Sequence, residues 1–235
     1  MTASSRTFIA LGVLVALIAG GAWWWNDGRL SSPLSFVEGE SITEWNFDGP
    51  YRDGGALEAQ ARAEIERFKG LLGNSKDYTD YTLYIGIAGQ HELLGEGRET
   101  YEYLLRALRV DAEKTGLAWH NLGVLYARLG APKTALLAYE RAKNAQSHII
   151  TYHTQYLSYF TDTFPDDRVA LETAFAASEE SLGALPDILR IRAAWLSDTG
   201  RIEEAIAEWE KIRTLTIPQA RSGVDEEIAR LRGKL

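Results

Sequence analysis

Most of this chain follows one recurring pattern of small and large side chains. In residues 116–149, large residues occupy positions 4, 7, 11 and 24 of a 34-residue frame, and small residues occupy positions 8, 20 and 27. Small side chains let two helices approach closely, and large ones fill the space around that contact. A unit of this kind cannot bury its apolar faces alone, so neighbouring units are required. The pattern is carried by Trp119, Leu122, Gly123, Tyr126, Ala135, Tyr139 and Ala142.

Three further segments fit the same frame with different degrees of agreement. Residues 81–114 and 186–219 keep most of the large and small positions, although Arg192 replaces an apolar residue in the second of them. Residues 151–184 fit by their spacing more than by their residue types. The chain therefore contains about four repeats, each expected to form a helical hairpin.

Two flanking segments are predicted to complete the array. Residues 56–72 place apolar side chains at steps of three and four, which is typical of a helix that packs on the first repeat. Residues 222–234 carry three apolar residues among charges, as expected for a C-terminal capping helix. The predicted repeat domain thus spans residues 56–235.

The unit at residues 116–149 resembles a tetratricopeptide repeat (TPR). Seven of its eight signature positions match, and Ser147 stands where the family has a proline. The resemblance covers about two thirds of the chain. It implies an all-α fold, a TPR-type solenoid of helical hairpins, and a role in binding other proteins.

The resemblance also implies a partner-binding groove, because the first helix of each TPR lines the concave face through positions 2, 5, 9, 12 and 13. The groove lacks the Lys and Asn set with which chaperone-binding members hold a terminal carboxylate. An amphipathic helix or an extended apolar segment would suit it better, with Tyr152 and Tyr159 as anchors. The alternative is that these two tyrosines pack between repeats. The predicted groove residues are Ile85, His120, Val124, Arg128, Tyr152, Gln155, Tyr159 and Arg190.

The N-terminal region contains an uncharged run at residues 7–25. As a helix it would span about 28 Å, which matches the hydrocarbon core of a bilayer. The run ends in Trp23, Trp24 and Trp25, residues favoured at a membrane interface. With Arg6 before the run and mostly acidic residues after it, residues 1–6 are predicted to be cytoplasmic and the remainder extracytoplasmic. The alternative is a cleaved signal peptide.

Residues 26–55 are rich in Gly, Pro, Ser and acidic residues and are predicted to form an irregular juxtamembrane linker. The segment nevertheless contains Phe36, Trp45, Phe47 and Tyr51. These rings are expected either to pack on the following domain or to dock a membrane partner.

The composition argues against several classes of function. Without cysteine the chain has no disulfide, no thiolate metal ligand and no thiol nucleophile. A net charge of −8 disfavours nucleic acid as a partner. The four histidines have no metal-ligand spacing, and no phosphate-binding or nucleophile motif occurs. We therefore predict no catalytic residues, no metal and no cofactor.

These observations together predict a non-catalytic, membrane-tethered scaffold for protein interactions. The predicted location is a bacterial cytoplasmic (inner) membrane, with the repeat domain on the periplasmic side, and the predicted partners are subunits of a membrane complex. The protein would serve there as an accessory or assembly subunit. The alternatives are a chaperone-like periplasmic factor for secretion or cytochrome assembly, and a binder of envelope polymer or lipid.

Overall fold

A computed structural model describes residues 34–235, which form one compact unit. The predicted cytoplasmic residues 1–6, the predicted membrane helix at residues 7–25 with Trp23, Trp24 and Trp25, and the start of the predicted linker lie outside the described residues. Within residues 34–235, no helix combines the length and apolar character required to cross a bilayer.

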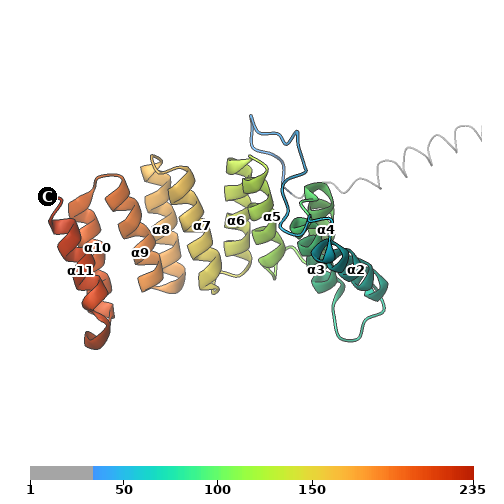
Figure 1. Ribbon diagram of the computed structural model, residues 1–235. Helices are drawn as coiled ribbons and strands as arrows, with labels where there is room; N and C mark the ends of the chain where they lie inside the picture. The colour runs from blue at the N-terminus through green and yellow to red at the C-terminus, as the bar shows by residue number, and fades with distance from the viewer. Residues whose placement is uncertain (1–33) are drawn as a thin grey trace, which may run out of the picture. The chain divides into compact units, whose positions relative to one another are not determined.

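The described unit is a row of α-helices connected by short loops (Figure 1). Within it, the pairing of Asn46 with Glu96 is the only β-bridge. This part of the chain is therefore all-α, as predicted. The helices are α2 (Ala56–Leu71), α3 (Asp80–Leu93), α4 (Gly97–Val110), α5 (Leu117–Arg128), α6 (Pro132–Ala145), α7 (Ile150–Thr163), α8 (Arg168–Leu182), α9 (Pro186–Asp198), α10 (Ile202–Leu215) and α11 (Ser222–Arg232), with a 3-10 turn at Pro218–Ala220.

Helices α3 to α10 form the four predicted hairpins. We call α3, α5, α7 and α9 the A helices, and α4, α6, α8 and α10 the B helices. Within α5–α6, all seven residues of the repeat pattern are buried. A β-carbon added at Gly123 would lie 2.9 Å from the ring of Tyr139, so the absence of a side chain at Gly123 lets the two helices meet.

Three of the four hairpin turns use the same backbone conformation. Gly95, Gly130 and Gly200 follow the A helices of the first, second and fourth hairpins, with φ of 74°, 78° and 76°. Glycine adopts this left-handed conformation without a steric cost. Pro165 occupies the corresponding place in the third hairpin, and its ring excludes a positive φ. In that hairpin α7 and α8 make fewer contacts with each other than the helices of the other pairs do.

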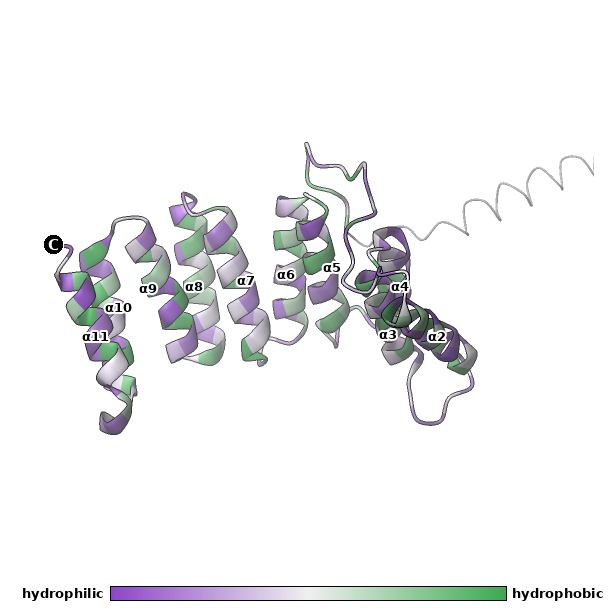
Figure 2. Cartoon of the chain, in the orientation of Figure 1, coloured by the Kyte–Doolittle hydropathy of each residue, from purple (hydrophilic) through white to green (hydrophobic). Residues whose placement is uncertain are grey.

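The flanking helices cover the ends of the row, as predicted. In α2, Ala61 and Ile65 form a buried cluster with Ile87 and Leu94 of the first repeat. In α11, Val224 and Ile228 pack with residues of α9 and α10. Figure 2 shows that hydrophilic residues alternate with apolar ones along all these helices, as expected for elements with one face in a core.

The predicted linker does not remain separate from the repeats. Its described part, residues 34–55, has no helix but packs on the first two hairpins, and the compact unit begins at Leu34. We call residues 34–55 the strap. Figure 1 shows it running past the ends of α3 to α6 at the edge where A helices turn into B helices.

Candidate functional site

The eight predicted groove residues lie on the four A helices. Ile85 is on α3, and Arg190 is on α9. None of the eight is buried, whereas each A helix buries a pattern residue, at Ile87, Leu122, Leu157 and Ala193 respectively. We call this row of partly exposed side chains the A-helix strip. Arg128, Gln155 and Arg190 are exposed, while Ile85, His120, Val124, Tyr152 and Tyr159 are half-buried.

Aromatic rings connect the second and third hairpins along the strip. The ring centroid of His120 lies 5.5 Å from that of Tyr139 and 5.9 Å from that of Tyr152. The rings of Tyr139 and Tyr159 are 4.9 Å apart. Tyr152 also packs so closely on Gly116 that a β-carbon there would lie 2.6 Å from its ring. Tyr152 and Tyr159 therefore pack between repeats, the alternative recognised in the sequence.

The tyrosine hydroxyls in this row remain protonated over the physiological pH range. Desolvation by burial raises the pKa of Tyr139 to about 12, and the nearby Tyr159 and Glu92 add to the effect. Burial also raises the pKa of Tyr159, whose hydroxyl donates a hydrogen bond to the carbonyl of Pro132 at 3.4 Å. These phenols are suited to packing and hydrogen bonding.

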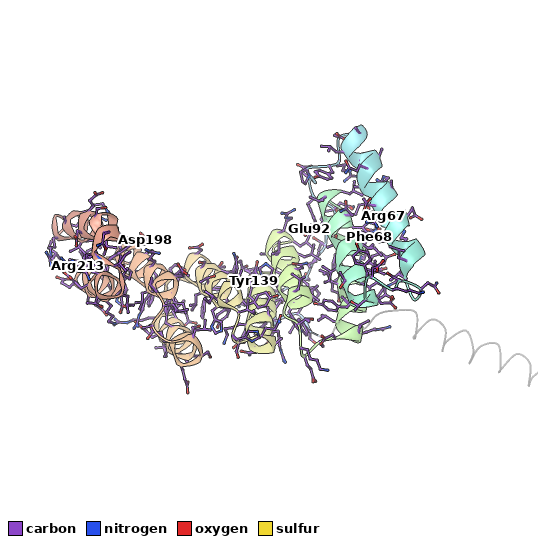
Figure 3. The ribbon with its side chains drawn as sticks, turned by 90° about the horizontal axis from the view of Figure 1, so that it is seen from below. Arg67, Phe68, Glu92, Tyr139, Asp198 and Arg213 are labelled. Carbon is purple, nitrogen blue, oxygen red and sulfur yellow. The ribbon has the colours of Figure 1, made fainter. Side chains whose placement is uncertain are left out.

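A carboxylate lies beside this aromatic row. The Glu92 carboxylate on α3 is 3.8 Å from the guanidinium of Arg128 on α5. Desolvation raises the pKa of Glu92, and Arg128 only partly opposes this effect. Arg128 also stacks over the ring of Phe47, 4.7 Å from its centroid. Figure 3 shows Glu92 and Tyr139 in the middle of the row of helices.

The strap supplies contacts that the sequence analysis missed. The carboxylate of Glu40 accepts hydrogen bonds from the backbone N–H groups of Lys133 and Thr134, at 2.7 and 2.8 Å, and from the Thr134 hydroxyl at 2.7 Å. Partial burial favours protonation of Glu40, but these hydrogen bonds outweigh it and keep its pKa below the usual value. Glu40 thus caps the first turn of α6, where no neighbouring residue in sequence does so.

The aromatic residues of the strap pack on the domain, the first of the two predicted alternatives. Phe36 contacts Tyr126 with ring centroids 5.6 Å apart, and Trp45 contacts Tyr101 at 5.1 Å. The backbone N–H of Phe47 also donates to the carbonyl of Gly95 at 3.1 Å. These rings therefore join the strap to the repeats.

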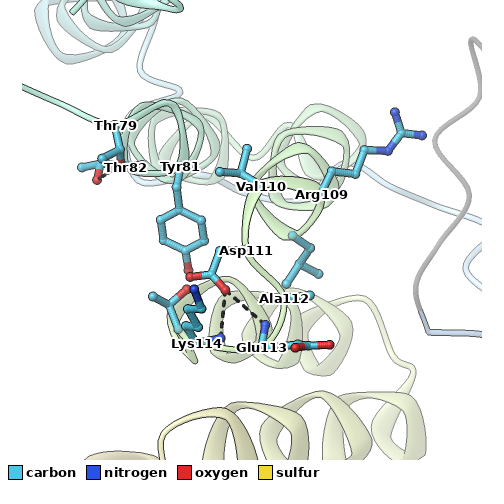
Figure 4. Close-up of a pocket in the computed structure, with 11 residues that line it drawn as sticks. Thr79, Tyr81, Thr82, Arg109, Val110, Asp111, Ala112, Glu113 and Lys114 are labelled. Atoms are coloured by element: carbon cyan, nitrogen blue, oxygen red, sulfur yellow. Dashed lines mark hydrogen bonds between the residues drawn. The ribbon is translucent and has the colours of Figure 1, made fainter. Parts of the chain in front are cut away.

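A cavity in the described unit lies away from the A-helix strip. It has a volume of about 770 Å³ and lies between the start of α3, the end of α4 and residues 111–115 (Figure 4). The Asp111 carboxylate beside it accepts hydrogen bonds from the backbone N–H groups of Glu113 and Lys114. This carboxylate therefore holds the loop, and no predicted groove residue lines the cavity.

Besides His120, whose contacts are with aromatic rings, two histidines make polar contacts. His91 pairs through Nδ1 with Glu96 at 2.6 Å, and His153 pairs through Nε2 with the carbonyl of Ser147 at 2.9 Å. Across residues 34–235, no three His, Asp or Glu side chains are grouped so as to hold a metal ion.

Solved structures include chains that are similar to this one. No family model matches the chain, and no curated protein matches it. Among solved structures the chain is similar to YrrB, described as a TPR protein with an unusual peptide-binding site. The sequence identity is 19%, the match covers 76% of this chain and 89% of YrrB, and the TM-score is 0.48.

Proposed function

We propose that this protein is a non-catalytic scaffold that binds a protein partner along the A-helix strip. The observation that carries the proposal is the exposure pattern: the eight strip residues retain contact with solvent on the four A helices, while each of these helices buries other repeat positions, at Ile87, Leu122, Leu157 and Ala193. Such a surface offers side chains at regular intervals on a preformed support. Preorganisation lowers the entropic cost of binding an extended or helical segment.

The proposal includes a membrane tether, for which the support is the uncharged run at residues 7–25 and its terminal tryptophans. We place the protein at a bacterial cytoplasmic membrane with the repeats on the periplasmic side. A tether raises the effective concentration of the strip near membrane partners, so a weak intrinsic affinity suffices. This favours an accessory or assembly subunit of a membrane complex.

The test uses the full-length protein, crosslinked in its native membrane and then purified in detergent. Replacing Gln155 and Arg190 by Ala should remove the crosslinked partner, because both side chains are exposed on the strip. The matched control replaces the exposed Arg141 and Glu180 by Ala on the B helices. Equal capture by both variants would contradict the proposal.

The same preparation tests whether the protein is a permanent subunit and whether residues 7–25 are retained. Stable co-purification with one complex would indicate a subunit, and transient crosslinks to many clients would indicate a chaperone-like factor. Mass spectrometry of the mature N-terminus would show whether residues 7–25 are retained, as the tether requires.

A further inference from the structure

Position 9 of the repeat frame carries side chains of different sizes on the four A helices. The residues at position 9 of the four repeats are Gly89, Val124, Tyr159 and Ala194, at intervals of 35 residues. On α7, Tyr159 places a ring against the second hairpin. On α9, Ala194 has only a methyl group to place toward α7. A cavity of about 170 Å³ lies here, lined by residues of α7 and α9, including Ala194.

The α7–α9 cavity is lined by apolar side chains and by two aspartates. Trp195 is 3% exposed, and its indole N–H donates to the carbonyl of Pro165 at 2.9 Å, so its ring is held in place. Ile191 and Ala194 add apolar surface. Asp162 from α7 and Asp198 from α9 bring carboxylates to the same cavity from its two sides.

These two carboxylates differ from the others nearby. Glu172, Glu179 and Glu208 all form ion pairs with Arg192. In contrast, Asp162 and Asp198 form no ion pair within the described residues. Two arginines lie nearby: Arg230 interacts electrostatically with Asp198, and Arg201 stacks over the Trp195 ring, 4.9 Å from its centroid. A cation from a partner could therefore form an ion pair with either carboxylate.

We propose that the α7–α9 cavity receives a lysine or arginine side chain from an extended basic segment of the protein partner. The aliphatic stem of such a side chain would contact Ile191, Ala194 and Trp195, while its charged end pairs with Asp162 and Asp198. This inference rests on the proposed scaffold function, and it specifies the chemistry of the partner at the end of the strip.

The test measures fluorescence anisotropy with the full-length protein in detergent. The probe is a labelled eight-residue peptide of alternating lysine and alanine, and the reference peptide has glutamine in place of every lysine. The lysine peptide should bind at least tenfold more tightly than the glutamine peptide at low salt, and added salt should weaken its binding.

Two kinds of variant examine the cavity independently. Asp162→Asn with Asp198→Asn removes the charges, and Ala194→Tyr fills the space while keeping both carboxylates. Because Ala194 is exposed, the larger side chain should be tolerated, which a melting curve will verify. Each variant should weaken lysine-peptide binding at least tenfold. The control, Glu180→Gln with Glu203→Gln, removes two exposed charges elsewhere and should bind like the wild type.

The outcomes separate this inference from the scaffold proposal. Equal binding of the lysine peptide by the aspartate variant and the control would show diffuse attraction to an acidic protein and would overturn the inference. No preference for lysine over glutamine would also overturn it. If the peptides fail but the crosslinked partner is still lost with Gln155→Ala and Arg190→Ala, the cavity assignment fails while the scaffold stands.

Discussion

The α5–α6 hairpin and the junction of α8, α9 and α10 use the same repeat frame with opposite chemistry. Position 7 of the frame is Leu122 in α5, fully buried among apolar residues. In α9 the same position is Arg192, which pairs with Glu172 and Glu179 of α8 and, at 3.6 Å, with Glu208 of α10. The frame thus accepts a cation where neighbouring helices supply carboxylates.

The apolar hairpin and the ionic junction should respond differently to added salt and to changes in side-chain volume. Apolar packing does not depend on the screening of charges, and it does depend on side-chain volume. An ion-pair network holds only while each charge keeps its partner, and removing one partner leaves the rest uncompensated. Arg201 extends the network by pairing with Glu172 at 3.0 Å and Glu204 at 2.6 Å. Of these two regions, the C-terminal junction should therefore be the one whose stability falls as added salt screens its charges.

The largest expected effect is in the apolar hairpin. Leu122→Ala should lower the free energy of unfolding by about 2–5 kcal/mol, because it leaves a cavity at a site with no exposed surface. Urea denaturation of the full-length protein measures this loss. Leu137→Ala on the exposed face of α6 is the control and should change stability by less than about 0.5 kcal/mol.

A smaller effect is expected at the ionic junction. Arg192→Leu restores an apolar residue but leaves Glu172, Glu179 and Glu208 without this cation, so stability should fall by about 1–3 kcal/mol. Hydrogen exchange should show the loss in α8 to α10. The wild-type junction should exchange faster at high salt, and the variant should lose that dependence. Salt-independent exchange in the wild type would argue that the network contributes nothing to the junction.

The strap extends the comparison, because its hydrogen bonds and ring contacts support the first two hairpins. Glu40→Gln removes the carboxylate that caps α6, and stability at neutral pH should fall by about 1 kcal/mol. The lowered pKa of Glu40 means that its contribution is present above the unfolded-state value and is lost as the pH falls through the folded-state value. Melting curves from pH 7 to pH 3 should therefore converge for the two proteins. Glu38→Gln, at an exposed strap position, should follow the wild type.

The smallest expected change in stability is at Glu92. This carboxylate lies beside the α5–α6 hairpin, and its one ion-pair partner among the described residues is Arg128, at 3.8 Å. Burial raises the pKa of Glu92, so its ionised form opposes folding at neutral pH, and this cost disappears as the pH falls through the folded-state pKa. Glu92→Gln should therefore raise stability at pH 7 by up to about 1 kcal/mol and give no gain at pH 4. Thermal melting at both pH values measures the difference, and a destabilised variant at pH 7 would show that the pair with Arg128 dominates.

The candidate site was predictable in part. Frame positions placed Ile85, His120, Val124, Arg128, Gln155 and Arg190 on exposed or half-exposed helix surfaces, because helical periodicity determines which residues share a face. For Tyr152 and Tyr159 the sequence left two alternatives, anchors for a partner or packing between repeats, and could not decide between them. Their packing depends on the ring of Tyr139 and on the missing side chain of Gly116, and only the approach of neighbouring helices brings these groups together.

The sequence by itself determined the array of hairpins. Its spacing of small and large residues encodes contacts between helices that are adjacent along the chain, and the segments at 56–72 and 222–234 could be recognised as helices for the same reason. Only the tertiary structure decided that the strap belongs to the domain and that Glu40 caps a helix more than 90 residues away. It also decided that Arg192 forms ion pairs with Glu172, Glu179 and Glu208. These contacts join residues from distant or irregular segments, and no local periodicity records them.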